Sequence, residues 1–344
     1  MNNTALQEWF KLTNQNRLNI FLETSKRKLL QLSAVEKDWW IVHALAVIFS
    51  MKYADVLVFK GGTSLSKGWN LINRMSEDVD MAIDREFLGF TGELTKGDIR
   101  KLRKKSYQFI SEKFTEELKR QFMESGFENI LVKCRETENH DQDPLVIEIN
   151  YPSLTAKEKY LKPAILVEIG SRSLKEPFTQ RSFGTIVSEV FEGNSFADKP
   201  ITIPVVNPER TFLEKIFLLH EEFQKKPDKI RVDRLSRHLY DIERLSKTKY
   251  AEIALQNTEL YHTIVNHRST FTPISGIDYA NHSPNKISII PPDFIIKEWE
   301  QDYEEMKQAM IFDNPLNFNE LIKRLMELQK RINSIKWKCE NLTH

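Results

Sequence analysis

VLVFKGGTSLSKGWNLINRMSEDVDMAI, residues 56–83, is the stretch that decides the fold of this chain. Two short apolar runs rich in β-branched residues, 56–59 and 79–83, are typical of β-strands. Between them, the pair Gly61 and Gly62 predicts a turn that opens a helix of about ten residues. We therefore expect a strand, a glycine turn, a short helix and a second strand in direct succession.

Two carboxylates, Asp78 and Asp80, stand at the start of the second strand. Because side chains alternate between the faces of a strand, both leave on the same side, with Cα atoms roughly 7 Å apart. Two such carboxylates repel each other unless a cation lies between them or one stays protonated. Hard oxygen ligands at this spacing suit Mg²⁺, which completes its shell with water and substrate phosphates.

The glycine turn predicts an anion site next to these carboxylates. Glycine allows a ligand to approach the backbone closely, and the N–H groups of residues 63–66 would face an anion at the helix start. After Gly62 the chain runs T-S-L-S-K-G, which lacks the G-K-[ST] ending of a Walker A loop. A phosphate cradle beside a carboxylate metal site indicates nucleotide chemistry, but a P-loop NTPase is disfavoured.

The residue sequence of this motif resembles that of a known family. FKGGTSLSKGW followed by RMSEDVDMAI resembles the signature of the DNA polymerase β-like nucleotidyltransferases, and within them the AbiEii/AbiGii toxin family. The resemblance implies an α/β (α+β) core with a mixed sheet, flanked by N-terminal helices and followed by an all-α C-terminal domain. It also implies a toxin whose activity a cognate antitoxin limits.

Composition is that of a soluble two-domain protein. The chain has 344 residues, 40% hydrophobic and 29% charged, with a net charge of +1. Pro204, Pro208 and a change of periodicity predict a domain boundary near 206. The resemblance implies that 1–205 form the nucleotidyltransferase core with its N-terminal helices and that 206–344 form the helical C-terminal domain. Cys134 and Cys339 are far apart, the N-terminus is not typical of a signal peptide, and no run is long enough to span a membrane. We expect a cytoplasmic protein.

Periodicity predicts the remaining elements. Helical spacing is found over 5–51, 93–125, 207–223, 294–312 and 317–337, and strands are expected at 129–134, 145–151, 164–169 and 201–206. Residues 171–198 are interpreted as loop and short helix. The stretch 261–293, rich in His, Asn, Ser and Pro, is interpreted as a long loop, and its histidines have no zinc spacing.

Two of the predicted strands contain one acidic residue each, Glu148 and Glu168. A carboxylate inside an apolar strand is costly unless it is paired or holds a metal. Polymerase-β-like enzymes place a third metal-binding carboxylate beside the D-x-D strand. We favour Glu168, which GSRS follows as the family resemblance implies, over Glu148; pairing with a base such as Arg172 is the structural alternative.

The C-terminal half contributes two further motifs. In NPERTFLEKIFLLHEEF, Lys215 falls beside an apolar helical stripe, where its stem could simply cover the core. ERTFLEK and SRHLYDIERL (236–245) resemble the third and fourth motifs of the AbiEii family. By that resemblance Lys215 contacts nucleotide phosphate and Asp241 positions the phosphate or the acceptor.

Two other features have both a structural and a functional interpretation. The pair Trp39 and Trp40 belongs in a core helix or forms an aromatic platform for a nucleobase. IRKLRKK (99–105) holds five basic residues within seven and is a solvated helix face or an RNA patch.

The resemblance predicts transfer of a nucleoside monophosphate from an NTP to an acceptor hydroxyl, for which the 3′ end of tRNA is favoured. The metal ligands would be Asp78, Asp80 and Glu168, holding two Mg²⁺ ions. The catalytic residues would be Asp78, Asp80, Lys215 and Asp241, and the nucleotide would contact Gly61, Gly62, Thr63, Ser64, Lys67 and Lys215. A protein-nucleotidylating enzyme and a non-catalytic nucleotide-binding interaction module are the alternatives.

Overall fold

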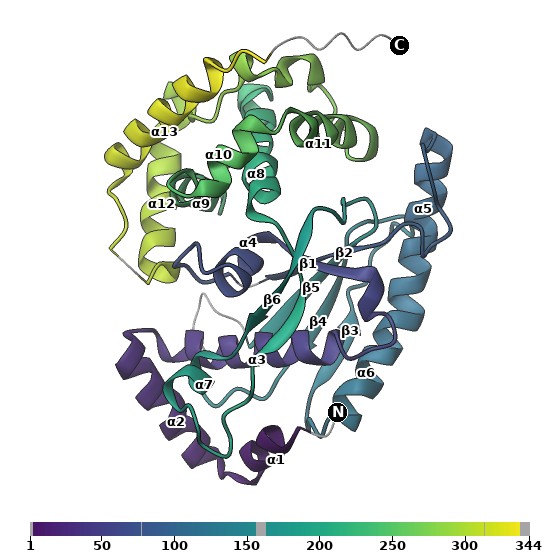
Figure 1. Cartoon of the computed structure of the whole chain (residues 1–344), viewed down its shortest axis with the longest axis vertical. Helices are drawn as coiled ribbons and strands as arrows, with labels where there is room; N and C mark the ends of the chain where they lie inside the picture. Colours follow the sequence, from purple (N-terminus) through teal and green to yellow (C-terminus); the bar gives the residue numbers. More distant parts are fainter. Residues whose placement is uncertain (1–2, 77, 156–162, 313, 338–344) are drawn as a thin grey trace. The chain divides into compact units, whose positions relative to one another are not determined.

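The computed structural model describes residues 3–76, 78–155, 163–312 and 314–337, so Cys339 lies outside it. The chain forms two compact units (Figure 1). The first consists of Met1–Asn70 and Met75–Val206, and the second of Leu71–Arg74 and Asn207–His344. We call them the sheet unit and the helical unit.

The sheet unit contains a seven-stranded mixed sheet in the order β3-β4-β5-β2-β1-β7-β6. Its strands are β1 (Leu57–Lys60), β2 (Asp78–Ile83), β3 (Leu131–Cys134), β4 (Leu145–Asn150), β5 (Ala164–Gly170), β6 (Phe178–Phe183) and β7 (Ile201–Val206). The pairs β2–β5 and β1–β7 are parallel, and the other neighbours are antiparallel. The sheet is therefore mixed, as the family resemblance implies.

Helices surround this sheet and form much of its core. They are α1 (Thr4–Lys11), α2 (Asn14–Lys28), α3 (Leu32–Ile48), α4 (Gly61–Thr63), α5 (Lys96–Gln108), α6 (Thr115–Glu124) and α7 (Ile186–Val190), with π-helical turns η2 (Ser64–Gly68) and η3 (Phe109–Phe114). In α3 every residue from Ser33 to Leu45 is buried, and the helix contacts β5. Trp39 and Trp40 thus belong to a core helix.

Alternation within the strands separates a buried face of the sheet from a partly exposed one. In β2 the side chains of Val79 and Met81 are fully buried, whereas those of Asp78 and Asp80 are partly exposed. The same alternation continues in the neighbouring strand β5. Both acidic residues of β2 consequently point to one face of the sheet, as their spacing predicts.

The structure corrects two predictions of local structure. Residues 171–198 contain a strand, β6, which is the last strand of the sheet order; all of its residues but Phe183 are at least partly exposed. Its sequence FTQRSF has no apolar periodicity to reveal it. The predicted long loop at 261–293 begins inside helix α11 (Thr258–Phe271) and continues through short 3₁₀ turns, η5 (Tyr279–His282) and η6 (Pro284–Lys286).

The helical unit contains six α-helices among its described residues and no strand among them. They are α8 (Pro208–Phe223), α9 (Ser236–Ser246), α10 (Lys249–Gln256), α11, α12 (Ile296–Met310) and α13 (Phe318–Asn333). The helices α8 and α9 contact each other, and α9 also contacts α12 and α13. The predicted architecture, a mixed sheet with N-terminal helices and an all-α C-terminal part, is confirmed.

A four-residue segment from the motif region joins the helical unit. The segment Leu71–Arg74 lies in the sequence between the π-helical turn η2 and the D-x-D strand β2. The backbone carbonyl of Asn73 accepts a hydrogen bond from the N–H of Phe312. The backbone N–H of Asn73 donates a hydrogen bond to the Tyr240 hydroxyl, at 3.3 Å. The helical unit is therefore built from two separate stretches of the chain, this short segment and the C-terminal part that begins at Asn207.

None of the described helices is both long and apolar enough to cross a membrane.

Candidate active site

Three carboxylates share one face of the sheet because of the register between β2 and β5. These strands are parallel, with Asp80 beside Glu168 and Asp78 beside Leu166. Paired residues of neighbouring strands point to the same side, so Glu168 emerges next to Asp80 on the face that also carries Asp78. All three side chains are partly exposed.

The register also separates Glu168 from the alternative third carboxylate. Glu148, on β4, is opposite Leu166 of β5, so one strand lies between it and the D-x-D strand. Its carboxylate pairs instead with Arg135 across 3.5 Å. Glu168 is thus the acidic residue that the fold brings beside Asp80.

Gly61 lies directly against the Asp80 carboxylate. Strand β1 pairs with β2 in antiparallel register, and Lys60 is opposite Asp80, which brings the next residue close to the side chain. A β-carbon at Gly61 would clash with Oδ2 of Asp80, and the backbone there has φ +79°. Glycine is favoured for both reasons, since other residues rarely adopt that conformation and any β-carbon would displace the Asp80 side chain.

The hydroxyl groups after the glycines stabilise the turn itself. Thr63 Oγ1 donates to the carbonyl of Asp78 at 2.5 Å, and Ser64 Oγ donates to the carbonyl of Gly61 at 2.9 Å. Both residues are buried, as is Gly62. In this structure Thr63 therefore ties the glycine turn to the D-x-D strand, and Ser64 closes the turn on itself.

Lys67 has a protein partner. Its ammonium lies 2.7 Å from Oδ1 of Asp38, which is buried in α3. The other carboxylate oxygen of Asp38 accepts the N–H of Ile186 at the start of α7. Lys67 thus connects the η2 turn to two helices of the sheet unit.

The helical unit contains a second charged cluster, built around Asp241. This residue is completely buried on α9. Arg74 donates to both carboxylate oxygens, from Nε to Oδ1 and from Nη2 to Oδ2, each at 2.7 Å. Lys215 on α8 places its ammonium 2.9 Å from Oδ2. One carboxylate therefore holds two cations in an environment shielded from water.

The cluster shifts the pKa values of its members. Burial disfavours the charged form of Asp241, but the nearby charges and hydrogen bonds of Arg74 and Lys215 outweigh it, and its pKa falls well below the usual range. Burial, assisted by Arg74, lowers the pKa of the Lys215 ammonium, which Asp241 opposes.

His238 completes this cluster as a neutral group. Its Nδ1 lies 3.3 Å from Nζ of Lys215. Burial, together with the charges of Lys215 and Arg237, lowers its pKa well below the ordinary value. A neutral imidazole can accept a hydrogen bond from the ammonium, so His238 orients Lys215.

Arg74 is the member of this set that sequence analysis missed. It is the first residue of the RMSEDVDMAI motif, but nothing in the motif or in the periodicity around it indicates a role for its side chain. A signal was available only in its position, a few residues ahead of the D-x-D motif. The same holds for Asp38, whose contact with Lys67 no spacing rule predicts.

The carboxylate face, which is the face of the sheet that carries Asp78, Asp80 and Glu168, has the oxygen ligands that a divalent metal needs. These oxygens are not yet close enough together to bind one ion. Carboxylate oxygens are the ligands that Mg²⁺ prefers. Among the residues that the structure describes, however, no three His, Cys, Asp or Glu side chains are grouped closely enough to hold a metal ion. The ligand types and their shared face fit a divalent cation, and side-chain rotation would be needed to bring the oxygens together.

Comparisons with known proteins identify the family of the chain and a structure of similar fold. Residues 44–327 match the family model described as nucleotidyl transferase AbiEii toxin, type IV TA system. The structure of MenT4, a nucleotidyltransferase toxin from Mycobacterium tuberculosis H37Rv, is similar in fold, with 16% identity and a TM-score of 0.50 over 92% of this chain and 90% of that one.

JHP933 from Helicobacter pylori is a weaker match, with 15% identity and a TM-score of 0.41 over 85% of this chain and 89% of that one. No curated protein sequence matches significantly. Enzymes of the matched family use an NTP and a divalent metal, and their type IV systems pair the toxin with an antitoxin. Since the family model covers most of its length, this chain belongs to the AbiEii family of nucleotidyltransferase toxins of type IV toxin–antitoxin systems.

Proposed function

We propose that the chain transfers a nucleoside monophosphate from an NTP to a hydroxyl of RNA, with the 3′ end of tRNA as the favoured acceptor. The acceptor oxygen forms a bond to the α-phosphorus while the bond from that phosphorus to the leaving oxygen breaks. Pyrophosphate departs, and the proton of the hydroxyl passes to solvent. The observation that carries this proposal is the register that sets Glu168 beside Asp80, on the face that also bears Asp78.

Asp78, Asp80 and Glu168 are the residues that would hold Mg²⁺, as two ions. Bound Mg²⁺ would supply charge stabilisation to the attacking and leaving oxygens. Gly61 leaves room for the Asp80 carboxylate against the backbone of the turn, beside which a phosphate of the NTP would bind. The backbone N–H groups at the start of α4 would face that phosphate.

The roles proposed for the hydroxyls and lysines follow from their contacts. Thr63 and Ser64 hold the glycine turn in shape through hydrogen bonds to backbone carbonyls. Lys67 would add positive charge while bonded to Asp38. Lys215 would supply a cation to the nucleotide phosphate, and Asp241 would act through Lys215 as a positioning residue.

Support for an RNA acceptor comes from α5. Of the five basic residues within 99–105, Arg100, Lys101, Lys104 and Lys105 are exposed, whereas Arg103 donates to the carbonyl of Asp141. Because the net charge of the chain is only +1, a local patch of this kind is what would attract a phosphate backbone.

The test is incubation of the protein with each NTP, labelled at the α-phosphate, with Mg²⁺ and total tRNA. We expect label on tRNA with the unaltered protein and with Glu148→Ala, and none with Asp80→Ala or Glu168→Ala. Label on protein alone would replace this proposal with protein nucleotidylation. NTP binding without any transfer would favour a nucleotide-binding interaction module.

A further inference from the structure

Three side chains form a row across the carboxylate face, one from each of three neighbouring strands. Asp80 of β2 lies in the middle, with Glu168 of β5 as its register partner on one side and Lys60 of β1 as its partner on the other. Paired residues of neighbouring strands point to the same side of a sheet, so Lys60 leaves the sheet on the face that carries the carboxylates. At about 4.8 Å between strands, the Cα atoms of the row span roughly 10 Å.

The ammonium of Lys60 is available to an anion from outside the chain. Lys60 is the last residue of β1, directly before the glycine turn, and it is partly exposed. Within the part of the chain that the structure describes, its ammonium has no ion-pair partner. A lysine side chain ends in a mobile point charge on a flexible stem, which suits a phosphate group that arrives with a substrate.

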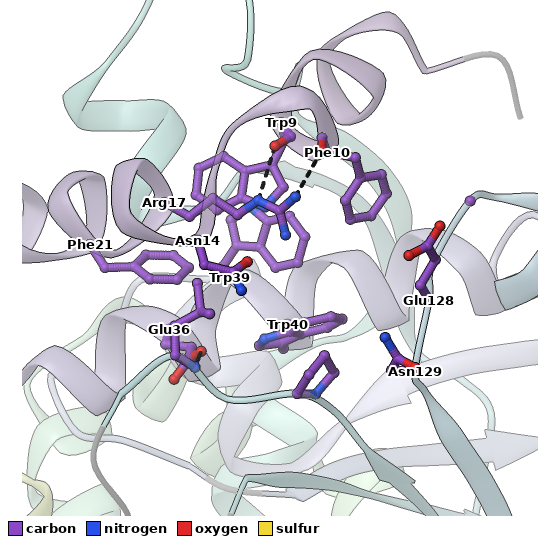
Figure 2. A pocket seen from close by; sticks show the side chains of 13 residues that line it. Trp9, Phe10, Asn14, Arg17, Phe21, Glu36, Trp39, Trp40, Glu128 and Asn129 are labelled. Carbon is purple, nitrogen blue, oxygen red and sulfur yellow. Dashed lines mark hydrogen bonds between the residues drawn. The ribbon is translucent and has the colours of Figure 1, made fainter.

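Lys67, the lysine of the motif itself, is in a different situation. Its side chain is only 14% exposed, and its ammonium lies 2.7 Å from the buried Asp38 carboxylate. Asp38 is followed in α3 by Trp39, whose ring stacks on Trp9 of α1 in the aromatic core of the sheet unit (Figure 2). The charge of Lys67 therefore balances a buried carboxylate, and Lys60 is the lysine that the register places beside Asp80.

The same face carries another lysine farther from Asp80. Lys133 of β3 is opposite Glu148 of β4, which is opposite Leu166 of β5, the register partner of Asp78. All four residues consequently point to one side of the sheet. Lys133 is exposed and lies three strands away from the D-x-D strand. It offers a matched comparison, with the same charge on the same face at the edge of the sheet.

The order of the row gives a direction to the transfer reaction. The attacking and leaving oxygens of a phosphoryl transfer lie roughly in line, on opposite sides of the phosphorus. Glu168 lies on one side of Asp80, and Lys60 with the glycine turn lies on the other. The leaving pyrophosphate carries most of the negative charge, so the side with the cation suits it, and the acceptor hydroxyl would approach from the side of Glu168.

Resting on the transferase reaction proposed above, we propose that Lys60 binds the β- and γ-phosphates of the NTP and stabilises the pyrophosphate as it leaves. The acceptor oxygen bonds to the α-phosphorus, and the bond from that phosphorus to the bridging oxygen breaks. The electron pair of the broken bond stays on the pyrophosphate, beside the ammonium. Lys60 keeps its proton throughout and acts by its charge alone.

The first test is calorimetric titration of the full chain with inorganic tripolyphosphate in the presence of Mg²⁺. This probe carries the phosphates of an NTP without a base, and its binding needs no acceptor. Lys60→Met keeps a stem of similar length and removes the charge, so it should weaken binding at least about tenfold. Lys60→Arg retains the charge and should restore most of the affinity.

Lys133→Met is the control for the net charge of the protein. It removes the same charge from the same face and should bind tripolyphosphate as tightly as the unaltered chain. An equal loss of affinity in Lys60→Met and Lys133→Met would show a general effect of charge and would overturn the inference. Unaltered affinity in Lys60→Met, or no binding of tripolyphosphate to the folded unaltered chain, would overturn it as well.

The labelled transfer assay separates this inference from the proposed function. We expect Lys60→Met to transfer more slowly and to be less sensitive to inhibition by added pyrophosphate. Binding of tripolyphosphate that depends on Lys60, without transfer to any RNA by the unaltered chain, would support the phosphate site and reject the proposed acceptor. Transfer by Lys60→Met at the unaltered rate would keep the reaction and reject the role of Lys60.

Discussion

The two charged clusters use the same residue type in opposite ways. On the sheet, Asp80 is partly exposed and lies beside Glu168, a like charge. In the helical unit, Asp241 is fully buried and holds two cations of the protein. Like charges in partial contact with water leave room for an external cation, whereas a neutralised buried carboxylate has none. The first arrangement suits chemistry, and the second suits positioning.

The comparison predicts the largest loss of activity at the exposed cluster. Asp80→Ala should lower kcat by about 10²–10³-fold or more, because it removes a charge from the centre of the reaction. The melting temperature should change little, since the carboxylate lies on a partly exposed face. Nucleotide transfer and thermal unfolding measure the two effects. Asp84→Ala, at the end of the same strand, is the matched control and should keep its activity.

The buried cluster should respond in stability as well as activity. Asp241→Asn leaves Arg74 and Lys215 without their shared carboxylate, and should cost about 3–5 kcal/mol in the free energy of unfolding. Chemical denaturation checks this value, with the exposed Asp233→Asn as control. An unfolding free energy equal to that of the unaltered chain would show that the cluster does not bear on stability.

Acid should destabilise the helical unit through another buried group. His220 on α8 has a pKa of about 4, lowered by burial and by neighbouring His282. The unfolded chain, with a histidine pKa near 6.5, binds more protons between these values, so stability is complete above about pH 6.5 and falls as the pH drops towards 4. The loss from this group is at most about 3 kcal/mol.

Unfolding free energies measured from pH 7 to pH 4.5 should show that decline, and His220→Gln should make it shallower. An unchanged slope in the variant would mean that His220 is not the responsible group.

The smallest effect is expected at Lys67, which pairs with the buried Asp38 of the sheet unit. Lys67→Met removes the partner of the buried Asp38 and should reduce stability by about 1–2 kcal/mol. If the lysine also balances phosphate charge, KM for the NTP should rise while kcat changes less than in Asp80→Ala. A KM equal to that of the unaltered protein would restrict Lys67 to its structural contact.

Much of the carboxylate face could be predicted from local spacing. The period of two in a strand places Asp78 and Asp80 on one face whatever surrounds them. Gly61 was predictable as a turn residue, but its contact with the Asp80 carboxylate depends on the pairing of β1 with β2. The strand β6 could not be predicted, because an exposed edge strand needs no apolar alternation.

The buried cluster could be predicted only in part. Family resemblance pointed to Lys215 and Asp241, which lie on different helices, α8 and α9. Nothing in the sequence indicates that Arg74 would occupy both oxygens of that carboxylate, because the contact joins residues 167 positions apart. Such a pairing depends on the packing of the segment 71–74 within the helical unit.

By itself, the sequence determined the elements with a strong period, the shared face of Asp78 and Asp80, and the family of the chain. The family resemblance favoured Glu168 over Glu148, and the strand register places Glu168 beside Asp80. The tertiary structure alone decided that Asp38 pairs with Lys67 and that Asp241 is buried between two cations. The physical reason is the distance along the sequence over which each kind of interaction acts. Periodicity and turn chemistry act over a few residues, whereas register, burial and ion pairing depend on which distant segments meet.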